Sequence, residues 1–211
     1  MLNDEINQNA IILYNYIKKL KHFIIVKEID GNYRNIGATI IDAILQPGIN
    51  YKNVVKPRVN KFLNDYSDKT TLKQFEDIIS NMSIEQIINW KKGKKTEIIL
   101  KLITLLREEN VQTEEDFREW ISKDVNIKKI KNISGIKCKT VDYIKILLGL
   151  NTNAIDRHLL EFIKLAGINI YSYHEAHEII SKTAELLNVN EAYFDHSIWK
   201  YMSEKKYTEE I

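Results

Sequence analysis

Residues 127–149 read IKKIKNISGIKCKTVDYIKILLG. Apolar residues recur at helical spacing on both sides of Ile133-Ser134-Gly135-Ile136, and a glycine in such a short stretch is typical of a tight turn. The pattern predicts a helix over 124–131, a turn, and a second helix over 137–149. This helix–turn–helix hairpin is the most informative element of the chain for both fold and function.

The start of the second hairpin helix is a predicted binding site for an anion. Backbone N–H groups in the first turn of a helix lack an intrahelical acceptor and carry partial positive charge, so a phosphate binds there without any base being recognised. Residues 128–139 add five lysines and no acid. We therefore predict contacts with the DNA backbone from Lys131, Gly135, Ile136, Lys137 and Cys138.

The composition favours a helical globular protein. Of the 211 residues, 44% are hydrophobic, and only two are proline and seven are glycine, whereas a β-sandwich needs a turn signal about every 8–12 residues. A single cysteine, Cys138, excludes a disulfide within the chain and a cysteine-rich zinc or iron–sulfur site. The net charge is only +2, so attraction to nucleic acid depends on local lysine clusters.

The sequence predicts no association with a membrane. The N-terminal residues lack the pattern of a signal peptide, and the apolar runs are shorter than the roughly 18 residues that a membrane span needs. We expect a soluble, cytoplasmic monomer.

Amphipathic spacing and helix caps place helices along most of the chain. Outside the hairpin, the predicted helices span 5–21, 35–46, 50–65, 71–80, 83–90, 94–109, 156–166, 173–188 and 190–203, with one more after Thr113. About ten helices with short connections predict an all-α, two-lobed helical bundle. We expect one lobe to cover 35–150, ending in the hairpin, and the other to combine 1–34 with 151–211.

A lysine and an aspartate at a defined spacing indicate a family. Asp156 follows Lys139 by seventeen residues, and the stretches GIKCKTVDYI and AIDRHL contain them. These stretches resemble the hairpin and the following helix start of the helix-hairpin-helix DNA glycosylase superfamily. The segments 37–62, 90–106 and 195–206 are also similar to that superfamily, and the last, with IDRHLL, is most like the compact archaeal-type 8-oxoguanine glycosylases.

The resemblance implies a bifunctional DNA N-glycosylase and abasic-site (AP) lyase of base excision repair, acting on 8-oxoguanine in duplex DNA. Lys139 would attack the sugar and form a Schiff base, and Asp156 would stabilise the oxocarbenium-like transition state. It also implies a DNA contact or packing role for His158, and lesion-pocket roles for Trp199, Asp195 and Gln46. We expect no cofactor, no side-chain metal ligands, and duplex DNA containing a damaged base as the partner of a nucleoid-associated protein. A monovalent cation on the backbone carbonyls of 131–136 is a further implication.

Two positions depart from the family pattern. Lys137 occupies the place of the hairpin's second glycine, and a lysine there would cost about 1 kcal/mol or more if the position needs a positive φ. Gln46 is shifted by a residue or two against Pro47 and Gly48 relative to the family's glutamine.

Several alternatives stay open. The lesion could be an oxidised pyrimidine, an alkylated purine, or a mismatched uracil or thymine. Asp156 could serve only as a helix N-cap, and Lys139 only as a phosphate contact. The chain would then be a non-catalytic DNA-binding module, or a helical scaffold with no affinity for DNA.

Overall fold

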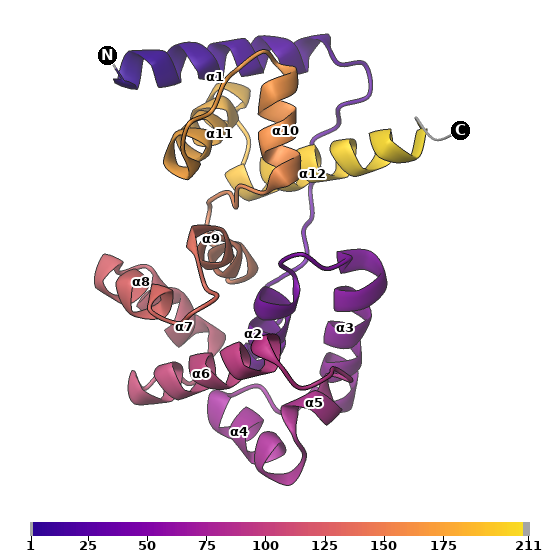
Figure 1. The fold of residues 1–211 in the computed structure, drawn as a ribbon, viewed down its shortest axis with the longest axis vertical. Helices are drawn as coiled ribbons and strands as arrows, with labels where there is room; N and C mark the ends of the chain where they lie inside the picture. Colours follow the sequence, from indigo (N-terminus) through magenta and orange to yellow (C-terminus); the bar gives the residue numbers. More distant parts are fainter. Residues whose placement is uncertain (1, 209–211) are drawn as a thin grey trace. The chain divides into compact units, whose positions relative to one another are not determined.

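The computed structural model describes residues 2–208, and within that range it contains twelve α-helices, one π-helical segment and no strand (Figure 1). The all-α prediction is confirmed. The elements are α1 (Leu2–Lys19), α2 (Ile36–Leu45), η1 (Tyr51–Val55), α3 (Lys56–Asp65), α4 (Leu72–Asn81), α5 (Ile84–Ile87), α6 (Lys94–Glu108), α7 (Glu114–Ile121), α8 (Asp124–Lys131), α9 (Cys138–Leu147), α10 (Arg157–Leu165), α11 (Tyr173–Leu187) and α12 (Glu191–Thr208).

The chain divides into two compact units, each with its own hydrophobic core. Gly31–Leu150 forms one unit, which we call the hairpin unit because it contains α8 and α9. The residues up to Asp30 and those from Asn151 onward form the other, which we call the terminal unit.

Helix α2 is the centre of the hairpin unit. All ten of its residues are buried, and it packs against α3, α4, α6, α7 and α9 (Figure 1). Its sequence, IGATIIDAIL, places apolar residues on every face, which is the pattern of a helix surrounded by others. Gly37 permits the closest approach, because a Cβ there would lie 2.9–3.0 Å from the rings of Phe62 and Phe75.

Caps define where most helices of the hairpin unit begin. The side chains of Thr71, Ser83 and Thr113 each accept a hydrogen bond from the third residue of the helix that follows, and that residue's side chain returns a bond to the cap backbone. Complete capping boxes thus start α4, α5 and α7. The helix predicted over 83–90 is shorter, because Asn89 adopts a left-handed φ of 47°.

The predicted helix over 50–65 is divided in the structure. Its first turn is the π-helical segment η1, and α3 begins with Pro57 in its first turn. Proline is tolerated there because its missing N–H would have no intrahelical acceptor. Pro57 therefore marks the start of the regular helix.

In the terminal unit, α1 packs along α11, and α12 contacts both α10 and α11 (Figure 1). The core includes a cluster of rings, in which Phe23 stacks on Phe162 at 5.5 Å and meets Phe194 edge-on at 6.2 Å. Val26 donates its amide to the Ser197 hydroxyl at 2.9 Å, so the segment after α1 is fixed to α12. Within residues 2–208, no helix combines the length and the apolar character needed to cross a bilayer.

Candidate functional site

The hairpin turn is held by a glycine and an isoleucine. Gly135 has a φ of +106°, and Ile136 donates its amide to the Ile133 carbonyl at 3.0 Å. The Ile136 side chain is 2% exposed and belongs to the core of the hairpin unit. Ile136 thus anchors the turn from inside. Both its amide and its side chain are engaged by the protein, which weighs against the predicted DNA contact from this residue.

Lys137 adopts an ordinary extended backbone. It is the N-cap of α9 with a φ of −125°, so the strain considered for a lysine at this position does not arise. The positive φ of the turn falls on Gly135 instead. The N-cap makes no side-chain capping bond, which leaves the first-turn amides of α9 for an anion.

Replacement of Gly135 by alanine tests this geometry. An added Cβ would lie 2.4 Å from Ile98 Cδ1, so we expect Gly135→Ala to lower the free energy of unfolding by about 2–3 kcal/mol. Urea unfolding measures this loss. Gly48→Ala is the matched control, because Gly48 also has a positive φ, +75°, but open space around its Cβ position. Equal losses in the two variants would contradict the close packing of the hairpin on α6.

Lys139 and Gln46 meet at one end of the hairpin unit. The Lys139 Nζ, on the first turn of α9, donates a hydrogen bond to Gln46 Oε1 at the C-cap of α2. The Lys139 side chain is half-buried, and its Nζ lies 5.6 Å from the centroid of the Tyr143 ring. Lys139, predicted as the nucleophile, and Gln46, predicted for the lesion pocket, are therefore in direct contact.

A buried carboxylate lies behind this contact. Asp42 of α2 is completely buried and accepts hydrogen bonds from the hydroxyls of Tyr33 at 2.6 Å, Tyr143 at 3.0 Å and Tyr51 at 3.2 Å. Three donors favour the charged carboxylate. Burial, reinforced by the charge of Asp42, raises the pKa of Tyr33 and of Tyr143 well above the usual value, so both phenols stay protonated as donors.

Lys95 is a second lysine at the same end of α2. Its Nζ lies 2.8 Å from the carbonyl oxygen of Ile44 and 3.0 Å from those of Leu45 and Pro47. Burial, followed by the charge of Lys139, lowers the pKa of Lys95 to about 8. Lys95 belongs to the stretch KKGKK at 91–95, and nothing in that stretch predicts its role as a cap on the C-terminal carbonyls of α2.

Asp156 is the N-cap of α10 in the terminal unit. Its Oδ1 accepts the amides of His158 at 2.8 Å and Leu159 at 3.1 Å. Asp156 therefore caps α10, and its catalytic role stays a prediction. A cap position is compatible with a chemical role, because it holds the carboxylate in a fixed orientation at a helix start.

The loop before Asp156 is fixed to α11 and α12. Ala154 donates its amide to Asp195 Oδ2 at 2.7 Å, and the Asn153 amide group donates to Glu191 Oε2 at 2.9 Å and Ser181 Oγ at 3.1 Å. Asp195, predicted for the lesion pocket, thus supports the backbone two residues before Asp156. Contact of Asp195 with a base stays a prediction.

His158 and Trp199 pack against each other. The His158 side chain is 8% exposed, and its ring meets the half-buried Trp199 indole edge-on with centroids 6.4 Å apart. His196 stacks on the same indole at 5.4 Å. This burial favours the packing role of His158 over a DNA contact, and stacking of Trp199 on a base stays a prediction.

Within the stretch 131–136, the Ile133 carbonyl accepts the Ile136 amide at 3.0 Å, and a monovalent cation on the backbone carbonyls of this stretch stays a prediction. We derive no step through such an ion. No group of three or more His, Cys, Asp or Glu within the described residues could hold a metal. Cys138 is half-buried, and Lys131 Nζ lies 3.3 Å from its sulfur.

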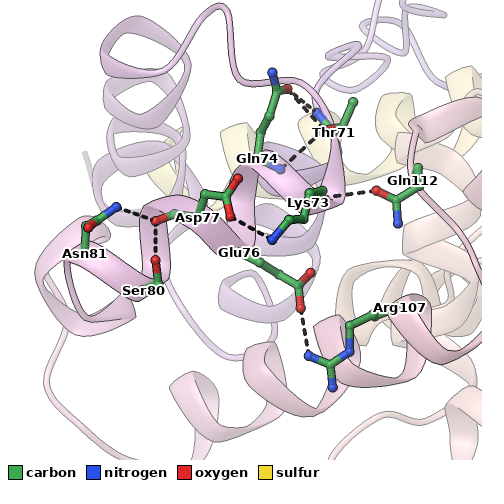
Figure 2. A network of polar contacts seen from close by, with 9 residues as sticks. All are labelled: Thr71, Lys73, Gln74, Glu76, Asp77, Ser80, Asn81, Arg107 and Gln112. Atoms are coloured by element: carbon green, nitrogen blue, oxygen red, sulfur yellow. Dashed lines mark hydrogen bonds and ion pairs between the residues drawn. The ribbon is translucent and has the colours of Figure 1, made fainter.

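A polar network on α4 and α6 is a separate surface feature (Figure 2). Lys73 pairs with Asp77 at 2.9 Å, and Arg107 of α6 pairs with Glu76 of α4 at the same distance. Exposed pairs of this kind contribute at most about 1 kcal/mol each. Since its charges pair within the network, we interpret it as a surface contact between two helices.

The comparisons with known proteins agree with this architecture. A crystal structure of H. pylori 3-methyladenine DNA glycosylase (MagIII) bound to 1,N6-ethenoadenine matches with a TM-score of 0.61 and 18% sequence identity, over 92% of this chain and 98% of that one. At this identity the likeness shows the fold. No curated protein sequence matches the chain. A family model does match over residues 13–203, nearly the whole chain, and the chain therefore belongs to the family described as domain of unknown function (DUF8548).

Proposed function

We propose that the protein is a DNA glycosylase with AP lyase activity, acting on duplex DNA as a monomer. The observation that carries the proposal is the placement of Lys139. Its amine is half-buried at the start of the hairpin helix α9 and contacts Gln46, in a chain that shares the fold of a DNA glycosylase. A lysine that served only as a phosphate contact would have no need of a partner from α2.

The hairpin would hold the DNA backbone. The first-turn amides of α9 have no side-chain cap and would bind a phosphate, with Lys137 and Lys131 adding positive charge. Phosphate contacts set the register of the protein on the duplex and carry no sequence information, which suits an enzyme that recognises a lesion in any sequence. The damaged nucleotide would be flipped out of the stack.

Lys139 would act as the nucleophile. The neutral amine attacks C1′ as the N-glycosidic bond breaks, and the base leaves with the bonding electrons and takes up a proton. After the amine loses a proton and the C1′–O4′ bond opens, the nitrogen holds the sugar as a Schiff base. Loss of a proton from C2′ then expels the 3′-phosphate, which nicks the strand, and water releases the lysine.

Asp156 would supply negative charge during the first step. A carboxylate stabilises the oxocarbenium character at C1′ and can accept the proton that the attacking amine loses. Both capping bonds end on Oδ1, so we assign this role to Oδ2.

Two lesions are candidates. The motifs around Lys139 and Asp156, with the segment 195–206, favour 8-oxoguanine, through their likeness to the compact archaeal-type enzymes. The structural neighbour is named for 3-methyladenine and is bound to 1,N6-ethenoadenine, which favours an alkylated adenine instead. We place 8-oxoguanine first, because the resemblance to the 8-oxoguanine glycosylases is also what implies a lysine nucleophile.

The test is a panel of duplexes that each contain one lesion: 8-oxoguanine, 1,N6-ethenoadenine, an oxidised pyrimidine, uracil opposite guanine, or an abasic site. Each is incubated with the full chain, with and without sodium borohydride. We expect a covalent complex on gels with the abasic duplex and with one lesion. Tight duplex binding without trapping or base release on any substrate would favour a DNA-binding module, and no binding at low salt would favour a scaffold protein.

A further inference from the structure

We infer that Lys95 is a positioning residue for Lys139, because its ammonium holds the end of α2 that presents Gln46 to the Lys139 amine. The inference rests on the proposed function, since it concerns the same nucleophile. It adds a residue that neither the motifs nor the comparisons assign.

The contacts explain how Lys95 would act. Its Nζ binds the carbonyls of Leu45 and Pro47, the residues on either side of Gln46, and also that of Ile44. Three hydrogen bonds to a helix C-terminus fix the backbone on both sides of the Gln46 side chain. The orientation of Gln46 Oε1, and with it the rotamer of Lys139, therefore depends on Lys95.

The charge of Lys95 has a second consequence. A neighbouring positive charge disfavours the ammonium form of an amine, and only the neutral form of Lys139 can attack a sugar. The mutual repulsion contributes to the lowering of the Lys95 pKa to about 8, and repulsion acts equally on both partners. Below that pH, Lys95 is charged and repels a positive charge on the Lys139 amine.

Other charges near Lys139 oppose or add to this effect. The negative charge of Asp42 favours the charged form of the Lys139 amine. The Asp42 carboxylate also accepts hydrogen bonds from three phenol hydroxyls, including that of Tyr143 on α9, and these bonds disperse its charge. Other titratable groups on α9 or at its start are Lys137 at the N-cap, Cys138, whose sulfur lies 3.3 Å from Lys131 Nζ, and Asp142 paired with Lys145. Among these, Lys95 is the charge tied to the backbone that carries Gln46.

Competitive labelling of the free protein tests the inference without any DNA. Trace acetic anhydride is applied over a range of pH, and tandem mass spectrometry gives the titration midpoint of each lysine separately. In Lys95→Met, the midpoint of Lys139 is expected to rise by about one pH unit. Lys95→Arg keeps a charge and hydrogen-bond donors near the same carbonyls, so it should restore the wild-type midpoint. Lys94→Met, which removes the exposed neighbouring charge, should leave that midpoint within about 0.2 units.

A reciprocal variant covers the case in which Lys95→Met does not fold. In Lys139→Gln, the midpoint of Lys95 should rise above about 8, because the repulsion between two sites has to act in both directions. The inference is overturned if neither midpoint moves, or if Lys94→Met shifts Lys139 as much as Lys95→Met. If the protein traps DNA but the titration midpoints of Lys139 and Lys95 do not move in the variants, the proposed function stands and Lys95 has no part in it. If the midpoints move but no DNA is trapped, the proposed function is wrong and the coupling between the two lysines stands.

Discussion

Lys139→Gln is expected to abolish borohydride trapping and strand nicking, with a loss on the order of 10³-fold or more. Glutamine has a similar length and keeps hydrogen-bonding capacity toward Gln46, but its amide nitrogen cannot attack C1′ or form a Schiff base. Duplex binding should weaken only a few-fold, because one of several cationic contacts is lost. The variant therefore separates binding from chemistry.

The measurement is a single-turnover assay on an abasic duplex, together with a binding isotherm at fixed salt. Lys101→Gln is the control, since Lys101 is an exposed lysine of α6 with the same loss of charge. It should trap DNA as well as the unmodified protein. If Lys139→Gln still nicks the strand at a substantial rate, Lys139 is not the nucleophile.

The helices could be predicted because their information is local. The turn of the hairpin, the capping boxes at Ser83 and Thr113, and the apolar spacing on either side all lie within a few residues of the helix ends that they determine. The π-helical segment η1 could not be predicted in the same way. Its i→i+5 pattern leaves no periodic signature in five residues, and Pro57 is the residue of the predicted helix over 50–65 that disfavours one continuous regular helix.

Only those residues of the candidate site that belong to a motif with a defined spacing could be predicted from the sequence. Lys139 and Asp156 follow from a motif, whereas the roles of Lys95 and Asp42 depend on tertiary contacts. Lys95 reaches carbonyls of residues 44, 45 and 47, about fifty positions away, from within a run of lysines that looks like a solvated surface. Asp42 has no sequence signature, because a single aspartate in an apolar helix does not indicate that Tyr33 and Tyr51, nine residues away on either side, and Tyr143 on α9 converge on it.

Lys137 is the opposite case. The family pattern suggested that a lysine at this position would be strained, and the structure shows that it is not. A second glycine implied a positive φ, yet the backbone at Lys137 is extended, and Gly135 alone adopts the left-handed conformation. The amides of α9 are still presented without a side-chain cap. The turn therefore tolerates a lysine at a position where its charge would favour a phosphate, without backbone strain.

Asp156→Asn is expected to slow base excision by about 10²- to 10⁴-fold while leaving the fold intact. Asparagine is as good an N-cap as aspartate, so its side-chain oxygen can keep the bonds to the amides of His158 and Leu159. What it loses is the negative charge that would stabilise the oxocarbenium ion and accept a proton. Asp156→Ala removes the cap as well, and should lower the free energy of unfolding by about 1 kcal/mol.

The pair of variants separates the two roles of this carboxylate. Single-turnover release of the damaged base gives the chemical effect, and urea unfolding gives the structural one. If the charge matters, both variants are slow but only alanine is destabilised. Wild-type excision by Asp156→Asn would reduce Asp156 to a helix cap. An asparagine variant that unfolds as readily as the alanine one would show that the charge itself stabilises α10, through its interaction with the positive end of the helix.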